Sequence, residues 1–538
     1  MTGSLMGAQQ LGVRTIFDRM RTVHAQGEVV DALPGGTVRT TYGALAERVL
    51  RLVTVLRDLG VRPGDRVGTF ANNTSRHVEL YYAVPLAGAV LHMVNIRLHD
   101  DQLEHVVADA QDTVMFVDDD LVPRLAEVAG RLGCVRTFVR LGGGATTGLP
   151  GLLDAETLLA AAEPTPVEAL PELPEDTPCG MCHTSGTTGL PKAVVYSHRS
   201  TYLHAMAMCM VDGLGLSERE RVLPVVPLFH ACGWGLPYAA PLTGAELVLA
   251  GPDTSPANLA RVIAAERVTW AAGVPTIWTS LLPLARSGEA DLTTLRTVAI
   301  GGSATPLALL ASYDDLGIEI LQIWGMTETS PVAAASRPRR RHRGLDAEGR
   351  REVRAKTGTI FAGLEARIAD PETGAELPWD GTSVGELQCR GPWVAVEYHG
   401  GMPEKFSPDG WLRTGDMAVM EQDGYFRIVD RSKDLVKSGG EWISSVELEG
   451  HVLAHPAVCD AAVVGVRSER WDERPVVIVS LHAGASLTLE ELREFLAGRV
   501  AKWWLPDDLV VVDKVATTSV GKYDKKVLRA MLADRVLP

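Results

Sequence analysis

Hydrophobic and polar positions alternate with two different periods along the first third of the chain. Segments with an apolar residue every three or four positions predict helices, and short apolar runs between them predict strands. The expected helices are residues 45–59, 103–110 and 121–132, and the clearest strands are residues 66–70 and 114–117. Because the two kinds of segment alternate, the pattern predicts α/β units built around a parallel sheet.

The same alternation returns between residues 202 and 323, after a stretch rich in proline and glutamate at 163–178. Its expected strands are residues 223–226, 246–249, 269–273 and 297–300. The arginine-rich segment 337–356 has no apolar period, so we expect a solvated helix or loop there. Residues 358–429 are rich in glycine, proline and β-branched residues and carry three Asp-Gly turn signals, at Asp380, Asp409 and Asp423, which predict short antiparallel strands.

The remainder of the chain reads as a separate α+β unit. It has expected helices at 445–454 and 488–500 and expected strands at 460–466, 475–481 and 509–512. We therefore predict an α/β protein with a large N-terminal domain of stacked α/β sheets, residues 1–430, which includes a β-rich subdomain. A small mobile α+β domain would follow at residues 431–538.

Composition narrows the range of functions. The chain has 538 residues, 46% of them hydrophobic, which allows several domains with large cores. A formal net charge of −15 argues against non-specific binding to nucleic acid. We find no apolar run long enough to span a membrane and no secretory leader, and therefore predict a cytoplasmic protein.

The seven cysteines are odd in number and scattered, which is typical of a reducing compartment rather than of a disulfide framework. Cys179 and Cys182 have the spacing of a redox or zinc pair, but the chain has no second pair of this kind. We interpret them as packing residues.

Residues 183–192, His-Thr-Ser-Gly-Thr-Thr-Gly-Leu-Pro-Lys, contain the strongest chemical signal of the chain. Glycines let the backbone approach an anion, hydroxyl groups add donors, and Lys192 adds a positive charge. The spacing fits neither the Walker A pattern nor the dinucleotide fingerprint. A solvated surface loop is the alternative, but the length of the motif favours a phosphate-binding loop.

This motif resembles the phosphate loop of the adenylate-forming superfamily, which comprises acyl-CoA synthetases, peptide-synthetase adenylation domains and luciferases. Further segments follow in the order and approximate spacing of that family, so the resemblance covers nearly the whole chain. They are residues 227–237 (Pro-Leu-Phe-His-Ala-Cys-Gly-Trp-Gly-Leu-Pro), 299–306 (Ala-Ile-Gly-Gly-Ser-Ala-Thr-Pro), 324–329 (Trp-Gly-Met-Thr-Glu-Thr), 411–416 (Trp-Leu-Arg-Thr-Gly-Asp), 430–434 (Asp-Arg-Ser-Lys-Asp) and 518–526, which contains Gly521-Lys522. One departure is Trp324, which stands where the family usually has tyrosine, so that the stacking face is kept and the phenolic hydroxyl is lost.

The resemblance implies a role for individual residues. Catalysis would depend on Lys522, His230, Thr187 and Arg431. ATP and CoA would contact Thr184, Ser185, Gly186, Thr188, Gly189, Lys192, Gly302, Ser303, Trp324, Gly325, Thr327, Asp416, Lys433, Lys437 and Trp442. Mg²⁺ would bind Glu328 and Thr184, and the acid substrate would contact Trp234, Gly301 and Val332.

The chemistry implied is the attack of a carboxylate on the α-phosphate of ATP, followed by transfer of the acyl group to the thiol of CoA. Both partners of the first step are anions, so positive charge and hydrogen-bond donors must hold them in line. By resemblance, Lys522 and the hinge near Lys433 lie on a domain that rotates between the two steps. We further expect Trp234, between two glycines, to gate the acyl channel rather than to be buried in the core.

The residues of these motifs are most similar to those of medium- and long-chain fatty-acid-CoA ligases. The acid could be a fatty acid or an aryl acid, including a cinnamoyl acid. Three further alternatives stay open: loading of a carrier protein, activation of a small oxyacid such as nitrite with transfer to an amine, and a catalytically silent nucleotide-binding scaffold. Lys522, Glu328 and Asp416 together argue against the scaffold, which needs neither a metal ligand nor a mobile lysine. The resemblance also allows a homodimer.

Overall fold

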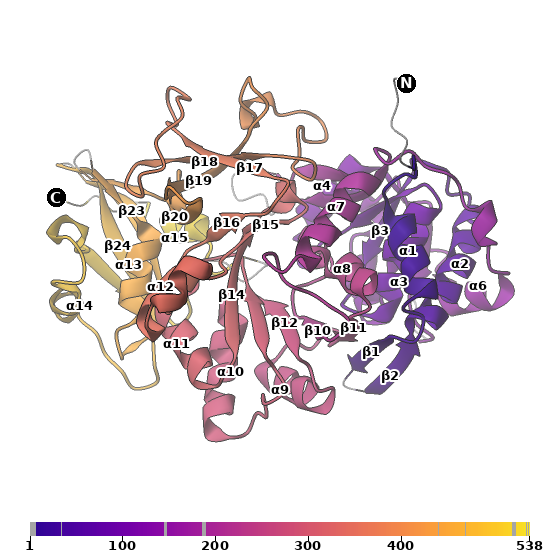
Figure 1. Cartoon of the computed structure of the whole chain (residues 1–538), viewed down its shortest axis with the longest axis horizontal. Coiled ribbons are helices and arrows are strands. Elements are labelled where there is room, and N and C mark those ends of the chain that lie inside the picture. Colours follow the sequence, from indigo (N-terminus) through magenta and orange to yellow (C-terminus); the bar gives the residue numbers. More distant parts are fainter. Residues whose placement is uncertain are drawn as a thin grey trace.

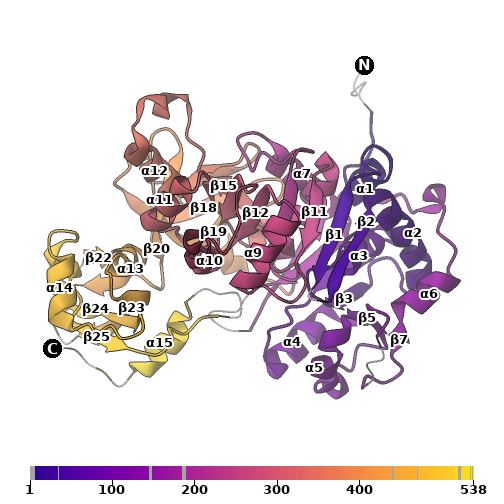
Figure 2. The ribbon, with the colours of Figure 1, turned by 90° about the horizontal axis from the view of Figure 1, so that it is seen from below.

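The computed structural model describes residues 7–33, 35–144, 148–184, 190–438, 441–468, 470–518, 523–533, 535 and 537. Figure 1 shows the chain running from an N-terminal α/β layer, through a central sheet, to a small C-terminal unit at the opposite end of the long axis. Figure 2 shows that this small unit, with α13–α15 and β21–β25, stands at one side of the rest of the molecule.

The N-terminal layer is built on a seven-stranded sheet. Its strands, in spatial order, are β7 (Leu153–Asp154), β6 (Thr137–Arg140), β5 (Asp112–Val117), β3 (Arg66–Phe70), β4 (Val90–Met93), β8 (Pro178–His183) and β9 (Ala193–Ser197). All neighbours are parallel except β8 and β9, which form an antiparallel hairpin. The associated helices are α2 (Tyr42–Asp58), α3 (Ser75–Leu86), α4 (Asp100–Ala110), α5 (Val122–Ala126), α6 (Ala155–Ala161) and α7 (His198–Cys209).

The central sheet has thirteen strands among the described residues, and its two halves differ in direction. The half next to the N-terminal layer is parallel apart from its edge strand and contains β14 (Glu319–Gly325), β13 (Thr297–Ile300), β12 (Trp270–Gly273), β10 (Arg221–Pro224), β11 (Glu246–Leu249), β1 (Glu28–Leu33) and the edge strand β2 (Gly36–Thr41). The other half is antiparallel, with β17 (Glu365–Ala369), β18 (Val384–Arg390), β19 (Leu412–Met420), β20 (Tyr425–Arg431), β16 (Gly358–Ile360) and β15 (Val332–Ala335). This antiparallel half is the β-rich subdomain expected from the turn signals, and Gly381, Gly410 and Gly424 all have positive φ.

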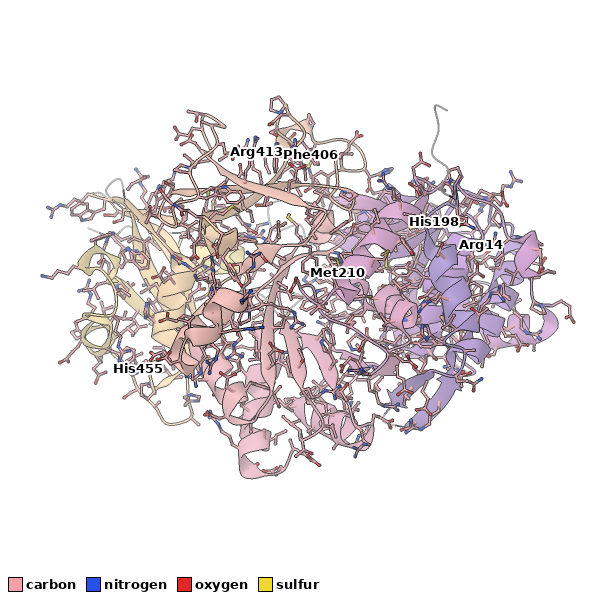
Figure 3. The ribbon with its side chains drawn as sticks, viewed as in Figure 1. Arg14, His198, Met210, Phe406, Arg413 and His455 are labelled. Carbon is pink, nitrogen blue, oxygen red and sulfur yellow. The ribbon has the colours of Figure 1, made fainter. Side chains whose placement is uncertain are left out.

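Helices of the middle of the chain accompany the central sheet. They are α1 (Val13–Thr22), α8 (Leu236–Thr243), α9 (Pro256–Ala265), α10 (Pro275–Ser287), α11 (Leu307–Asp315) and α12 (Ala347–Ala355). Helices α1 and α7 lie side by side, where the amide of Val13 donates to Nδ1 of His198 at 3.3 Å; Figure 3 labels His198 and the neighbouring Arg14. The main apolar core extends through the N-terminal layer, α1, α7 and α8, and part of both halves of the central sheet.

The C-terminal unit has its own sheet and its own apolar clusters. Its strands are β21 (Val436–Ser438), β22 (Glu441–Ile443), β23 (Val458–Ser468), β24 (Asp472–Leu481) and β25 (Asp508–Val511), and its helices are α13 (Ser445–Leu453), α14 (Leu489–Leu496) and α15 (Lys525–Met531). Two clusters fill it, one next to α13 and α14 and the other next to α15. The α/β class, the large N-terminal sheets and the smaller C-terminal α+β unit are therefore confirmed, whereas the boundary at 430/431 stays a prediction.

Two expected helices differ from the structure. Residues 121–132 form a short helix, α5, between the 3₁₀ turns η1 (Asp119–Leu121) and η2 (Ala129–Arg131), because Pro123 starts α5 and the chain turns again near Gly130. The helix expected at 488–500 ends at Leu496, and Gly498 two residues later has a φ of +78°. A glycine in the left-handed region just after a helix is a common stop signal.

Candidate active site

The phosphate-loop motif lies between strands β8 and β9. Its two ends are joined, because the amide of Thr184 donates to the carbonyl of Lys192 at 2.8 Å and the amide of Lys192 donates to Oγ1 of Thr184 at 3.2 Å. We call this pair the neck of the phosphate loop. The other residues assigned here, Ser185, Gly186, Thr187, Thr188 and Gly189, lie outside the described residues, so their roles stay predictions.

A second group of candidate residues meets where β14, β19 and β20 lie together. The indole Nε1 of Trp324 donates to Oδ2 of Asp416 at 2.9 Å, and Nε of Arg431 lies 3.0 Å from Oδ1 of the same carboxylate. Asp416 and Arg431 are direct partners in the antiparallel β19–β20 ladder, which explains why they meet. Asp416 is buried, and its negative charge is the largest influence that raises the pKa of Arg431.

The hydrogen bond between Trp324 and Asp416 was not foreseen from the sequence. The two residues are far apart in the chain, and the motif comparison suggested only that the ring could stack on a base. The ring also meets Phe426 edge-on, with 5.7 Å between the ring centroids. Trp324 thus fixes the orientation of the buried carboxylate as well as offering an aromatic face.

Glu328 lies close to this group on the 3₁₀ turn η5 (Thr327–Thr329) and is only 6% exposed. The hydroxyl of Tyr398 donates to Oε1 of Glu328, and the amide of Ala395 donates to the Glu328 carbonyl at 2.7 Å. Burial and the charge of Glu328 raise the pKa of Tyr398, so the phenol stays a neutral donor. Tyr398 is a residue of the site that the motif comparison missed.

The oxygen atoms present fit Mg²⁺ better than a resident transition metal. Glu328 offers a hard carboxylate oxygen and Thr184 a hydroxyl, which is the donor set that Mg²⁺ uses together with substrate phosphates. Among the described residues, no cluster of three or more His, Cys, Asp or Glu side chains could hold a metal ion.

Two glycines of the site are required by close packing. A Cβ on Gly301 would lie 2.8 Å from Cγ1 of Ile323 and 3.2 Å from the Trp234 ring, and a Cβ on Gly325 would lie 1.9 Å from the carbonyl oxygen of Pro331. Gly302 has a φ of +91°, a conformation that favours glycine. With Ser303, Gly301 and Gly302 form the turn after β13, as the motif predicted, whereas Gly325 ends β14.

The segment that carries His230 and Trp234 has an unusual backbone. His230 precedes the turn η4 (Ala231–Gly235), in which Cys232 and Trp234 have φ values of +48° and +54°. Left-handed backbone costs about 1–2 kcal/mol for a residue with a side chain, and such strain gathers at functional sites.

Trp234 itself is only 8% exposed and belongs to the main core. Our expectation that this ring is not part of the core is therefore wrong, because Gly301 leaves a flat surface on which the indole packs. Whether it also gates an acyl channel stays a prediction.

Val332 bonds to His204, a histidine that lies beside the η4 turn. The amide of Val332 donates to Nε2 of His204 on α7 at 3.1 Å, and burial lowers the pKa of His204 to about 3. A cavity of about 10 Å³ lies beside His204, Cys232 and Gly235, which is barely the space of one water molecule. An acyl tail that enters here must displace side chains.

The candidate residues described in the C-terminal unit differ from those above in being exposed. Lys433, Lys437 and Trp442 are exposed, and Nζ of Lys437 sits 4.9 Å from the Trp442 ring centroid. Lys522 lies outside the described residues. The structure thus brings together Trp324, Asp416 and Arg431, and separately joins Thr184 to Lys192. The roles assigned to these residues stay predictions.

Comparison with known proteins identifies the family. Residues 19–399 match the family model described as AMP-binding enzyme, and residues 447–522 match its C-terminal domain. A long-chain-fatty-acid–CoA ligase of Thermus thermophilus is 43% identical over 531 residues, which cover 98% of this chain and 96% of that protein. A medium-chain-fatty-acid–CoA ligase of Ectopseudomonas oleovorans is 40% identical over 100% of this chain and 98% of the relative, and a 3-methylmercaptopropionyl-CoA ligase of Ruegeria lacuscaerulensis is 41% identical over 99% of both.

Solved structures give the same fold. An anthranilate CoA ligase in complex with anthranoyl-AMP superposes with a TM-score of 0.87 over 98% of both chains at 23% identity. ATP-bound MatB from Rhodopseudomonas palustris superposes with a TM-score of 0.83 over 97% of this chain and 99% of that chain, at 25% identity. The resemblance to the adenylate-forming superfamily, and to its fatty-acid-CoA ligases, is confirmed: the chain belongs to the family of AMP-binding enzymes.

Proposed function

We propose that this protein is an ATP-dependent acid–thiol ligase, which converts a carboxylic acid, ATP and CoA into acyl-CoA, AMP and pyrophosphate. The observation that carries the proposal is the group formed by buried Trp324 and Asp416 with the partly exposed Arg431, next to Glu328. It combines an aromatic face, an ionised acceptor, a cation and a metal-binding oxygen at one place in the fold. Relatives with full-length similarity are named as CoA ligases.

Each residue then has a defined task in the first half-reaction. Asp416 accepts hydrogen bonds from the ribose hydroxyls, and the face of Trp324 stacks on adenine. Thr184 and Lys192 hold phosphate oxygens at the neck of the loop, while Arg431 neutralises charge on the nucleotide. When bound with ATP, Mg²⁺ on Glu328 supplies charge compensation for the phosphates.

The acid substrate would lie between His230, Trp234, Gly301 and Val332. Carboxylate attack on the α-phosphate brings two anions together, so Lys522 is the residue assigned to their neutralisation in the adenylating pose. In the second half-reaction the C-terminal unit rotates, Lys522 leaves, and the thiol of CoA attacks the acyl-adenylate. Lys433 would serve as the pivot, and Lys437 and Trp442 would face the pantetheine arm.

We place the acid in the class of fatty and small thioether acids, since the relatives named above act on medium- and long-chain fatty acids and on 3-methylmercaptopropionate. Activation of nitrite and loading of a carrier protein are disfavoured, because the full-length relatives are CoA ligases.

The test is pyrophosphate release and thioester formation across a panel of acids. It should include straight-chain acids from propanoate to palmitate, 3-methylthiopropanoate, cinnamate and nitrite, each with and without CoA. We expect acyl-CoA from one or more of the fatty and thioether acids, with adenylate alone when CoA is omitted. Nitrite-dependent AMP formation that needs no thiol, or no pyrophosphate release with any acid, would refute the proposal.

Two further properties belong to the same proposal. No helix among the described residues is long and apolar enough to cross a membrane. The seven cysteines are all free thiols, which supports a reducing cytoplasm. A homodimer is a separate prediction, which sedimentation velocity would test.

A further inference from the structure

Helix α13 of the C-terminal unit docks on the end of strand β20, close to the predicted pivot. Figures 1 and 2 both place α13 beside β20, where the C-terminal unit meets the rest of the molecule. The hydroxyl of Ser444, the N-cap of α13, donates to the carbonyl of Val429. The amide of Ser445 donates to Oδ2 of Asp430 at 2.6 Å, and the Ser445 hydroxyl donates to the same oxygen. These bonds cross the domain boundary predicted at 430/431.

Lys525, the first residue of α15, extends the same set of contacts. Its Nζ donates to Oγ of Ser445 and lies 2.7 Å from Oε1 of Glu449 on α13. The amide of Val463 on β23 donates to that carboxylate oxygen at 2.8 Å. The ammonium group therefore joins α15 to α13, and through the Ser445 hydroxyl it joins both helices to Asp430.

The cluster is largely closed to water. Asp430 is 1% exposed, Ser445 is fully buried, and the side chain of Lys525 is 11% exposed. Burial alone would lower the pKa of Lys525, but the charges of Glu449 and Asp430 raise it, so the side chain is a cation. Separation of this cation from its carboxylates is costly, because buried charges would be left without a partner.

Asp430 is fixed to the nucleotide site as well as to the C-terminal unit. It pairs with Met417 in the β19–β20 ladder, and the next residue, Arg431, pairs with Asp416. Oδ1 of Asp430 accepts the amide of Arg431 at 2.7 Å, while Oδ2 faces Ser445. A rotation of the C-terminal unit about Lys433 that leaves β20 in place therefore breaks the bonds from α13 to the end of this strand.

Two features associate these contacts with the adenylating pose. Trp442, which is proposed to face the pantetheine arm in the second half-reaction, is 44% exposed, and its ring packs against Lys437 of the same hairpin. Lys525 follows Lys522 by three residues in the sequence. The bonds that hold Lys525 thus restrain the chain that follows the lysine assigned to adenylation.

We propose that the cluster Asp430–Ser445–Lys525–Glu449, here named the hinge clamp, holds the C-terminal unit in the adenylating pose and opens before transfer to the thiol. The inference rests on the proposed function, which assigns the rotation about Lys433 and the role of Lys522. Lys525 is a positioning residue of the first half-reaction, because it acts through Ser445 and Asp430. Weakening the clamp shifts the population of poses away from the adenylating one.

Ser445→Ala is the mildest way to open the clamp. It removes the hydroxyl that joins Lys525 to Asp430, leaves the Lys525–Glu449 ion pair in place and adds no bulk. Lys525→Met removes the cation and keeps an unbranched side chain. Thr488→Ala is the matched control, because it also removes a hydroxyl from the start of a helix in the C-terminal unit, and the Thr488 side chain bonds Glu491 of its own helix.

The first measurement compares the two half-reactions. Adenylation is followed as pyrophosphate release without CoA, and transfer as thioester formed from supplied acyl-adenylate and CoA. We expect Ser445→Ala to slow adenylation about tenfold, the effect of one hydrogen bond to a charged group, and Lys525→Met to slow it further. Thioester formation should keep the wild-type rate in both variants, and Thr488→Ala should keep both rates.

The second measurement needs no ligase activity. The backbone amide of residue 445 is protected by its bond to Asp430, so its hydrogen exchange, read by mass spectrometry, reports opening of the clamp. In substrate-free protein, exchange at this amide should be about tenfold faster in Ser445→Ala than in wild type or Thr488→Ala. Amides of β23 and β24 should exchange as in wild type, which shows that the unit itself stays folded.

The inference is overturned if Ser445→Ala slows both half-reactions equally, slows thioester formation alone, or matches Thr488→Ala in adenylation. An unchanged exchange rate at residue 445 also overturns it. If Lys525→Met does not fold, Ser445→Ala decides alone. Failure of the proposed function would appear differently, as no pyrophosphate from wild type with any acid, while hydrogen exchange would still report on the clamp.

Discussion

Replacement of Trp324 by phenylalanine separates the two contributions of this side chain. Phenylalanine keeps an aromatic face for adenine but removes the indole N–H that donates to Asp416 at 2.9 Å. The carboxylate would then keep Arg431 as its partner but lose the neutral donor that fixes its second oxygen. We expect weaker ATP binding, because a carboxylate that can rotate is a poorer acceptor for two ribose hydroxyls.

The expected magnitude follows from the contacts. A hydrogen bond to a charged group contributes about 1.5–3 kcal/mol, and the lower end applies here because Arg431 remains. If the less firmly oriented carboxylate lowers the binding free energy of ATP by about 1.5 kcal/mol, the Kd for ATP rises roughly tenfold. The smaller ring also loses part of the edge-on contact with Phe426, worth about 0.5–1.5 kcal/mol, which should appear mainly as lower thermal stability.

A double-mutant cycle with Asp416→Asn isolates the pair, with the Kd of ATP measured by calorimetry for all four proteins and Tm as the check of folding. Trp411→Phe is the matched control, since Trp411 is similarly buried but stacks against Arg367 and Arg390 instead of bonding Asp416. A coupling energy below about 0.5 kcal/mol, or an ATP affinity equal to that of the control, would show that the indole N–H does not position the carboxylate.

Three other variants test the remaining assignments. Lys522→Ala should reduce adenylate formation by at least about 10²-fold while leaving thioester formation from supplied acyl-adenylate intact, and equal loss in both assays would contradict the domain rotation. Glu328→Gln should raise the Mg²⁺ concentration needed for half-maximal pyrophosphate release, and an unchanged Mg²⁺ titration would remove Glu328 from the metal site. Trp234→Ala should lower the free energy of unfolding by about 3–5 kcal/mol, because the ring is buried on Gly301. The variant should also shift the preferred acid toward longer chains. If the folded variant keeps the wild-type acid preference, Trp234 is a core residue only.

Strands in the parallel part of the fold were predictable because both of their faces are covered. The expected strands at 66–70, 246–249 and 297–300 coincide with β3, β11 and β13, whose burial makes each a short apolar run between polar turns. The helix expected at 121–132 is not formed as one element. Its apolar residues all belong to one buried cluster, which preserves the period, but Pro123 starts a new short helix and the chain turns again near Gly130, so the period does not imply one continuous helix.

The identity of site residues was predictable from motifs, but their partners were not. Motif spacing indicates which side chains share a family pattern, yet it carries no information on contacts between distant segments. The hydrogen bonds from Tyr398 to Glu328, from the Val332 amide to His204 and from Trp324 to Asp416 depend on how the sheets pack. Nothing in the local sequence marks Tyr398 or His204.

The placement of these contacts bears on the proposed domain rotation. The hydroxyl of Tyr196 on β9 donates to the carbonyl of Thr327 at 2.8 Å, so the N-terminal layer is tied directly to the turn that carries Glu328. Together with the Trp324–Asp416 bond, this contact holds Trp324, Asp416 and Glu328, which are proposed to bind the nucleotide and Mg²⁺, outside the domain predicted to begin at residue 431. The proposed rotation of that domain would therefore remove Lys522 without disturbing these three residues. This separation allows an acyl-adenylate to stay bound while the thiol approaches, which the two half-reactions require.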